Sequence, residues 1–402
     1  MRVAVIGGGA AGFFAAISCK THHPKAEVVI YEKGSKLLSK VKVSGGGRCN
    51  VTHQCFDNKK LAAHYPRGEK FLRNAFSQFA VEDAIDWFES NRVVLKAEND
   101  GRMFPVTDDS QTIINALMTK ARQLGIVLNL KQQAAQLLVK QGGLDIISHE
   151  GIEFSYNKVI VASGGSPKIE GLQWLEVLGH AISPPVPSLF TFNMPNEPVK
   201  ALMGVAVERA TIKVQGTKLK QSGPLLITHW GMSGPAILKT SAWGARELSD
   251  LGYKFKIQVN WVDDKSENDL RLMINEMQEN HHKRMVANKN AFGIPSRLWE
   301  FLMTKIGLRA DIIWGEIGQK GVNKLVNVLL NDVYQVEGKT TFKEEFVTCG
   351  GVALSDINNE TMESKRVPGL YFAGEVMDID GITGGFNFQV AWTTGWIAGK
   401  LT

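Results

Sequence analysis

The sequence predicts an α/β protein whose first domain is built on a parallel sheet and is interrupted by a second, β-rich domain with a helical insertion. A glycine-rich turn, Gly7-Gly8-Gly9-Ala10-Ala11-Gly12, follows a short apolar run and precedes a helix-like stretch, Phe13 to Lys20. A second apolar run, Val28 to Tyr31, leads into the acid Glu32. Apolar runs alternate with helical stretches up to about residue 184 and again after about residue 341, as in α/β domains.

Changes in composition divide the chain into three expected parts. The run Pro184-Pro185-Val186-Pro187 predicts a hinge, and strand-like runs dominate the residues that follow it. We expect an α/β domain at 1–185 and 342–402, a β-rich substrate-side domain at 186–264 and 334–341, and a helical insertion at 265–333.

Local signals place the individual elements. Asp109 or Ser110 can cap a helix that stops at Gly125, and Ser266 with Asp269 resembles a capping box. Helices are also expected at about 235–248, from Pro295 onward, at about 322–329 and at 386–400. Strands are expected at 126–130, 134–139, 144–148, 158–162, 189–194, 205–214, 225–228, 255–261 and 370–373.

Composition limits the class of protein. The 402 residues, 44% hydrophobic and 21% charged, suffice for two or three globular domains. No run of about 18 apolar residues is present, so we expect no membrane span. Met1-Arg2 runs straight into an apolar strand, which argues against a signal peptide and predicts a cytoplasmic protein. The four cysteines are too scattered for a disulfide framework or a zinc pattern.

The net charge of +6 is spread along the chain, with one local cluster from His281-His282-Lys283-Arg284 to Lys289. A solvated helix face explains such a cluster most simply. Binding of nucleic acid or of another anionic partner is the alternative.

The order strand, glycine turn, helix, strand and acid is typical of a dinucleotide-binding βαβ unit. Gly7 permits the tight turn, Gly9 lets a pyrophosphate approach the backbone, and Gly12 lets the helix pack on the strand. The helix N-terminus favours phosphate, and Glu32 can accept hydrogen bonds from ribose hydroxyls. A glycine turn without a ligand would leave Glu32 unexplained. The motif alone does not distinguish NAD from FAD.

A second motif runs from Lys42 through Ser44-Gly45-Gly46-Gly47-Arg48-Cys49-Asn50 to Thr52. Its adjacent glycines expose backbone N–H groups and let a large flat ligand approach the main chain. The alternative, a flexible surface loop, does not account for the interleaved polar residues. Five residues separate Cys49 from Cys55, whereas disulfide-reducing flavoenzymes have four, so we expect no catalytic disulfide.

In two further motifs, an expected buried strand is followed by small residues. One is Val159 to Gly165, and the other is Gly369 to Glu375, followed by Asp378, Asp380 and Gly384-Gly385. The dipole of a helix that begins after Gly385 would stabilise negative charge on a reduced flavin ring. The three acids could instead bind a metal, but no histidine or further acid stands near them in sequence, so we expect none.

The segment Thr228 to Pro235 contains His229, a possible general acid or base or a group that orients a substrate carbonyl. A turn with a hydrogen-bonded histidine is the alternative.

These motifs resemble the bacterial FAD-dependent oxidoreductases of the aminoacetone oxidase and BaiN type, also called YhiN-like flavoproteins. The resemblance rests on the glycine turn with Glu32, Ser44 to Asn50, Thr228 to Pro235, and Thr361 to Asn387. One departure is Ala162-Ser163-Gly164-Gly165, where the family usually has Ala-Thr-Gly-Gly. The resemblance implies a glutathione-reductase-type FAD domain, split by a β-barrel-like domain that itself carries a helical insertion.

The resemblance implies FAD as the cofactor, with adenine at the backbone of Ala134 and the flavin ring beside residues 45–50 and 385–388. Arg48 and His229 are the expected catalytic residues. The expected cofactor-binding residues are Gly7, Gly9, Ala10, Ala11, Gly12, Glu32, Lys33, Lys42, Ser44, Gly45, Gly46, Arg48, Cys49, Asn50, Ala134, Ala162, Gly164, Gly374, Glu375, Asp378, Gly384, Gly385, Phe386, Asn387 and Phe388.

We therefore expect a redox enzyme that passes a hydride between flavin N5 and a small organic substrate bound between the two domains. Because no second GxGxxG follows a strand, a transiently docked NAD(P)H or oxygen is the expected second partner. A flavoprotein that modifies tRNA or acts on other nucleic acid is the alternative. The sequence pI of about 9.0 favours it, and the scattered charge opposes it. A non-catalytic FAD-binding scaffold is a third hypothesis, and the oligomeric state is left open.

Overall fold

The computed structural model describes residues 1–148, 151–263, 265–288, 290–341 and 347–402. The chain forms two compact units, Met1–Ser188 with Phe342–Thr402 and Leu189–Thr341. The first contains a parallel sheet and the second an antiparallel sheet, so the predicted α/β class is confirmed. No helix in the described part of the chain is both long and apolar enough to cross a membrane.

A five-stranded parallel sheet forms the centre of the first unit, in the order β20-β10-β1-β2-β6. Its strands are β1 (Arg2–Ile6), β2 (Glu27–Glu32), β6 (Val127–Leu130), β10 (Lys158–Val161) and β20 (Leu370–Phe372). The middle strand is fully buried at Val3, Ala4 and Val5. Because the strands are parallel, their carboxyl ends lie along one edge of the sheet, where ligands of such folds bind.

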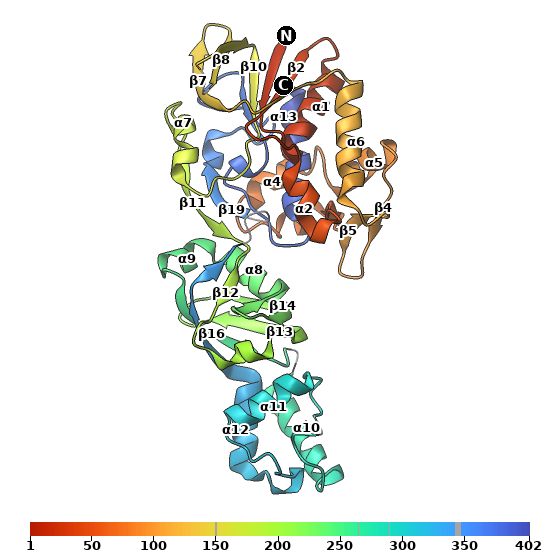
Figure 1. The fold of residues 1–402 in the computed structure, drawn as a ribbon, viewed down its shortest axis with the longest axis vertical. Helices are drawn as coiled ribbons and strands as arrows, with labels where there is room; N and C mark the ends of the chain where they lie inside the picture. Colours follow the sequence, from red (N-terminus) through yellow and green to blue (C-terminus); the bar gives the residue numbers. More distant parts are fainter. Residues whose placement is uncertain (149–150, 264, 289, 342–346) are drawn as a thin grey trace. The chain divides into compact units, whose positions relative to one another are not determined.

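The first and last helices of the chain pack against each other in this unit, as Figure 1 shows for α1 (Ala10–His22) and α13 (Phe386–Lys400). Two glycines of α13 make this close packing possible. A β-carbon at Gly395 would lie 2.6 Å from the carbonyl oxygen of Ala11, and one at Gly399 would lie 2.4 Å from that of Ala15. The predicted final helix coincides with α13.

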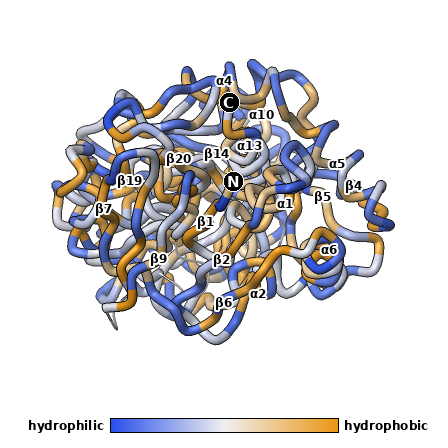
Figure 2. Tube along the Cα trace, turned by 90° about the horizontal axis from the view of Figure 1, so that it is seen from above, coloured by the Kyte–Doolittle hydropathy of each residue, from blue (hydrophilic) through white to orange (hydrophobic). Residues whose placement is uncertain are grey.

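The remaining elements of the first unit surround this core. Its other helices are α2 (Ser39–Gly47), α3 (Asn58–Ala62), α4 (Glu69–Ala75), α5 (Val81–Ser90), α6 (Ser110–Gln123) and α7 (Gln173–Glu176). Its small antiparallel sheets are β3 (Thr52–His53) with β5 (Arg102–Pro105) and β4 (Leu95–Ala97), β7 (Ala134–Lys140) with β8 (Gly143–Ser148) and β9 (Glu153–Tyr156), and β11 (Ile182–Ser188) with β19 (Val347–Val352). Figure 2 shows many of the peripheral loops in blue, the hydrophilic end of the scale.

Two predictions about this unit can be compared directly with the structure. The side chain of Asp109 caps α6 by accepting a hydrogen bond from the backbone N–H of Gln111 at 2.9 Å, as predicted. The run predicted as a hinge, residues 184–187, forms part of β11, which ends at Ser188, the last residue before the second unit; its role as a hinge stays a prediction. The register with β19 shifts between Ser183 and Val186, which accommodates prolines that have no N–H to donate.

The second unit contains a seven-stranded antiparallel sheet in the order β17-β16-β13-β14-β15-β12-β18. The strands are β12 (Thr191–Asn193), β13 (Ala206–Val214), β14 (Lys220–Ile227), β15 (Gly231–Ser233), β16 (Lys254–Asn260), β17 (Asp332–Glu337) and β18 (Lys339–Thr340). Only Gly338 separates β17 from β18, although these strands stand at opposite ends of the sheet order.

The helices of the second unit share one hydrophobic core with its sheet, in which Ile257, Trp299 and Leu325 are fully buried. They are α8 (Pro235–Trp243), α9 (Ala245–Asp250), α10 (Glu267–Asn280), α11 (Ser296–Lys305) and α12 (Gly318–Asn331). The single helix predicted at 235–248 is wrong, since Gly244 separates α8 from α9. The division of this unit into a β-rich domain and a separate insertion stays a prediction.

Candidate functional site

The glycine turn lies at the carboxyl end of β1, in tight contact with its surroundings. Gly7 has a φ of +117°, and a β-carbon there would lie 2.2 Å from the carbonyl oxygen of Ala162, which follows β10. A β-carbon at Gly12 would lie 1.9 Å from the carbonyl oxygen of Gly7. Glycine at these two positions is therefore required by the packing of the fold itself.

Gly9 differs from its two neighbours in the motif. A β-carbon at Gly9 would meet no heavy atom within 4 Å, so the packing gives no reason for a glycine there. Gly9 is also the N-cap residue of α1 and offers no side chain to its first turn. A helix N-terminus with open space at its N-cap residue is an arrangement that suits a pyrophosphate.

Glu32 ends β2 beside this turn and is held in place by two backbone groups. Its Oε2 accepts a hydrogen bond from the N–H of Gly8 at 2.9 Å, and its Oε1 accepts one from the N–H of Gly34 at 2.7 Å. Two charge-assisted hydrogen bonds fix the carboxylate, whose remaining lone pairs are available to ribose hydroxyls.

Gln132 lies next to Glu32 and was not predicted from the sequence. Its backbone N–H donates to the carbonyl oxygen of Glu32 at 3.0 Å. Its side-chain Oε1 is buried and has no hydrogen-bond partner within the described residues. Such an orphaned acceptor fits a donor supplied by a ligand. Ala134, the predicted adenine contact, stands two residues further on, at the start of β7.

The predicted segment Ser44 to Asn50 is a broken helical turn at the end of α2. Gly45, Gly46 and Gly47 have φ values of +59°, +70° and +86°, and a β-carbon at either of the last two would meet open space. The glycines therefore leave the backbone of this turn open to the close approach of a ligand. With its amide oriented to satisfy both neighbours, Asn50 accepts a hydrogen bond from the N–H of Gly385 at 3.0 Å.

This contact brings the second motif to the N-terminus of α13, and neighbouring side chains fix the position of that terminus. Phe386 is buried and packs against the rings of both His53 and His64, with centroid distances of 4.6 and 4.4 Å. The side chain of Asn387 exchanges two hydrogen bonds with the backbone of Gly381. Phe388 stacks on Trp392. Because these side chains are engaged within the protein, the backbone of residues 384–386 is what remains for a cofactor.

The acidic residues after β20 have separate partners. Gly374, whose β-carbon would lie 2.8 Å from that of Ala11, brings this segment to the glycine turn. Glu375 accepts hydrogen bonds from the N–H of Thr348 at 2.8 Å and from Nζ of Lys40 at 2.7 Å. Asp378 is half-buried, and its N–H donates to the carbonyl oxygen of Val352 at 2.9 Å.

Asp380 is fully buried and bound to Arg67 and to Ser188, whose hydroxyl lies 2.6 Å away. Burial raises the pKa of Asp380 above its ordinary value, against the opposing effect of the Arg67 guanidinium. Its lone pairs are taken by this network, which links residue 67 to the segment before α13.

Arg48, the first predicted catalytic residue, is held by its neighbours. Its Nη1 lies 2.6 Å from Oε1 of Glu98, and its guanidinium carbon lies 4.0 Å from the centroid of Phe104. Lys42 stands nearby and pairs with Asp109 at 3.7 Å, while Lys33 is exposed. Arg48 is therefore a positioned cation at the end of the glycine segment.

Cys49 is fully buried and has a φ of +61°. Burial raises the pKa of its thiol to about 12, so the reactive thiolate is absent at neutral pH. All four cysteines are free thiols.

The structure brings the predicted residues of the first unit together along one edge of the parallel sheet. Gly7 follows β1, Glu32 ends β2, Ala162 follows β10 and Gly374 follows β20. His229, the other predicted catalytic residue, belongs to the second unit, where it is exposed and packs edge-on against Trp230 at 4.1 Å.

Comparison with known proteins identifies the family. Residues 1–401 match the family model described as the HI0933-like protein Rossmann domain. The chain belongs to this HI0933-like family. It is a family of FAD-dependent oxidoreductases, so the predicted resemblance and the flavin cofactor are confirmed.

Relatives with known activities cover almost the whole chain. The ribosomal RNA dihydrouridine synthase of Escherichia coli K12 is 30% identical over 98% of this chain and 95% of its own length. The 3-dehydro-bile acid delta(4,6)-reductase of Clostridium scindens is 27% identical over 99% of this chain and 98% of its own length. The ribosomal RNA dihydrouridine synthase of Haemophilus influenzae is 27% identical over 98% of this chain and 96% of its own length.

Solved structures show the same fold at low sequence identity. An open flavocytochrome c3 fumarate reductase matches 100% of this chain and 77% of its own, with a TM-score of 0.50 and 18% identity. The Escherichia coli quinol fumarate reductase flavoprotein matches 100% and 69%, with a TM-score of 0.50 and 13% identity. These likenesses establish a fold shared with the fumarate reductase flavoproteins.

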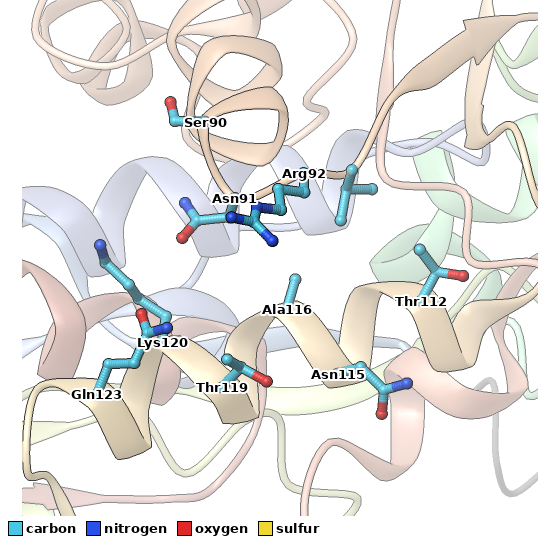
Figure 3. A pocket seen from close by; sticks show the side chains of 10 residues that line it. Ser90, Asn91, Arg92, Thr112, Asn115, Ala116, Thr119, Lys120 and Gln123 are labelled. Carbon is cyan, nitrogen blue, oxygen red and sulfur yellow. The ribbon is translucent and has the colours of Figure 1, made fainter.

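A separate groove lies between the end of α5 and the side of α6 in the HI0933-like chain. Figure 3 shows Asn91 and Arg92 on one side of it, and Thr119, Lys120 and Gln123 on the other. None of the predicted cofactor residues lines this groove.

Proposed function

We propose that this flavoprotein reduces a carbon–carbon double bond conjugated to a carbonyl group, and that its substrate is a uracil base in ribosomal RNA. The observation that carries the proposal is the similarity to a ribosomal RNA dihydrouridine synthase along 98% of the chain. Uridine becomes dihydrouridine when its C5–C6 bond, conjugated to the C4 carbonyl, is saturated.

The bile-acid reductase among the relatives supports the same reaction type. A delta(4,6) system beside a 3-oxo group is also an activated double bond, so both activities fit one chemistry on different substrates. A small 3-oxo compound is therefore the second candidate substrate, in agreement with the small organic substrate expected from the sequence.

The residues of the first unit fit FAD. Glu32, Gln132 and Ala134 would hold the adenosine, and the open space at Gly9 would admit the pyrophosphate. The segment 45–50 and the N-terminus of α13 would hold the flavin ring, with the helix dipole favouring its reduced, anionic form. We infer that this unit is a glutathione-reductase-type FAD domain and that the second unit is β-barrel-like, since Gly338 alone joins the end strands of its sheet.

Bound FAD, once reduced, would supply a hydride from N5 to the carbon β to the carbonyl, and the α carbon would take up a proton. Arg48 is the group of this chain that we assign to the substrate carbonyl. Glu98 and Phe104 fix its guanidinium, so it can bind an oxygen without reorganising. NAD(P)H is the proposed donor that returns the flavin to its reduced state, because uracil reduction consumes one hydride per turnover.

Mass spectrometry of nucleosides tests the proposal. Ribosomal RNA from a strain that lacks the gene is incubated anaerobically with the purified holoenzyme and NADPH or NADH, then digested. We expect new dihydrouridine in this RNA, and none with the donor omitted. If neither donor yields dihydrouridine and the enzyme instead turns over a 3-oxo-Δ4,6 steroid, RNA is not the substrate and the small 3-oxo compound takes its place.

A further inference from the structure

We propose that the outer face of the antiparallel sheet in the second unit is the surface that docks the RNA backbone. This inference rests on the proposed function and names the part of the chain that carries it out. Excess positive charge is concentrated in this unit: residues 189–341 contain 20 Lys and Arg against 15 Asp and Glu. The rest of the chain contains 26 against 25.

Lysines from three neighbouring strands share the outer face. Lys213 on β13 lies directly opposite Lys220 on β14 and, on its other side, opposite Gln258 on β16. Lys256 stands two residues before Gln258, so it faces the same way, opposite Gln335 on β17. The lysines are exposed, whereas the alternate residues Ile212, Val214 and Ile257 are fully buried in the core.

The pairing of Lys213 with Lys220 is unfavourable for the fold alone, because like charges directly opposite each other destabilise a sheet. Within the described residues, neither lysine nor Lys256 forms an ion pair. Elsewhere in the unit cations do have partners, as in the pair of Arg209 with Asp263 at 2.8 Å. A row of lysines without acidic partners is complementary in charge to a polyanion that binds across the strands.

The composition of the face favours RNA over an anionic membrane. Gln258 and Gln335 stand opposite Lys213 and Lys256, and amide groups hydrogen-bond to phosphate and ribose oxygens. Surfaces that bind membranes combine cations with a large apolar face. Val333, opposite Gln258, is the exposed apolar residue in the row that contains Lys213.

Fluorescence anisotropy with a labelled ribosomal RNA fragment tests this surface in the full-length holoenzyme. The test variant is Lys213→Gln with Lys220→Gln, and the control is Lys25→Gln with Lys168→Gln, two exposed lysines of the first unit. We expect the test variant to bind roughly 10- to 30-fold more weakly at about 0.1 M salt, with a salt slope smaller by about 1.4. The control should bind as the wild type does.

Thermal unfolding separates docking from a structural role: the test variant should unfold at the wild-type temperature or above it, because a repulsion has been removed. Wild-type affinity and salt slope in the test variant would overturn the surface and leave the proposed function standing. Failure of the wild type to bind RNA at low salt, together with no dihydrouridine formed, would overturn the proposed function too. Binding of phosphatidylglycerol vesicles but not of RNA would also overturn the inference.

Discussion

A β-carbon at Gly12 would lie 1.9 Å from the carbonyl oxygen of Gly7, whereas one at Gly9 would meet open space. The same motif therefore separates folding from cofactor binding. Gly12→Ala should destabilise the protein by about 3 kcal/mol or prevent folding, because the backbone of the turn must move. Gly9→Ala should fold but bind FAD at least about tenfold more weakly, because the methyl group enters the pyrophosphate space.

Thermal unfolding of the apoprotein and titration with FAD measure the two effects. Gly9→Ala should lower the stability of the apoprotein by no more than about 1 kcal/mol, the cost of alanine at an N-cap. Equal losses of apoprotein stability in both variants would show that Gly9 serves packing and not the ligand.

Glu32→Gln should weaken FAD binding by about 10- to 100-fold. The amide keeps one acceptor but loses the charge and the second of the two hydrogen bonds from Gly8 and Gly34. Gln132→Leu, which removes a buried acceptor without a protein partner, should also weaken FAD binding and leave the stability of the apoprotein unchanged or higher. Calorimetric titration with FAD gives the FAD affinity of both variants. An unchanged FAD affinity in Gln132→Leu would remove Gln132 from the adenosine site.

Arg48→Lys should keep FAD and lose at least about tenfold in turnover, because lysine cannot retain both the pairing with Glu98 and the stacking on Phe104. Glu98→Gln should lower turnover less, since Phe104 still orients the guanidinium. Steady-state kinetics with matched flavin content measures this. Wild-type turnover in Arg48→Lys would exclude Arg48 from the chemistry.

Thiol reactivity should be confined to Cys55 in the native protein. Cys19, Cys49 and Cys349 are buried, and burial raises the pKa values of Cys19 and Cys49 to about 12. Ellman's reagent should therefore modify Cys55 in the folded protein and all four cysteines after unfolding. The Cys49→Ser variant should retain turnover. A variant that binds FAD normally but is inactive would show that this thiol takes part in the reaction.

Stability should fall as the pH drops below about 6.5, partly through His180. This ring is buried, with Nε2 2.7 Å from the hydroxyl of Ser364, and burial lowers its pKa below the ordinary 6.5. Below that value the unfolded chain takes up a proton before the native state does, so protonation favours unfolding, by at most about 1.4 kcal/mol per pH unit. Denaturant unfolding at several pH values should show a flatter profile for His180→Gln; an equally steep profile would assign the effect to other groups.

Patterns local in sequence predicted the parts of the fold that depend on local physics. The βαβ unit, the Asp109 cap and the whole of α13 follow from glycine spacing, capping residues and apolar periodicity. The strand β11 was not predicted, because prolines at a sheet edge resemble a linker in composition. The break at Gly244 was missed because the apolar pattern continues across it.

In the candidate site, too, local patterns were predictable from the sequence and contacts between distant residues were not. Glu32 and the glycine positions are recognisable from their spacing, but Gln132 becomes visible only when β6 is placed beside β2. The packing of Phe386 against His53 and His64 joins residues more than 300 positions apart, and no single-sequence pattern records such a contact. The lysine row likewise depends on strand register, which the sequence did not fix.

Re-oxidation of the flavin by RNA tests the central claim most directly. The holoenzyme is reduced anaerobically, freed of donor and mixed with ribosomal RNA from a strain that lacks the gene, while the flavin absorption band is followed. The account predicts that the oxidised band returns with this RNA, accompanied by dihydrouridine, and does not return with buffer or with the same RNA after complete reduction of its uridines. A band that stays bleached with RNA and returns only with oxygen or a small 3-oxo substrate would contradict it.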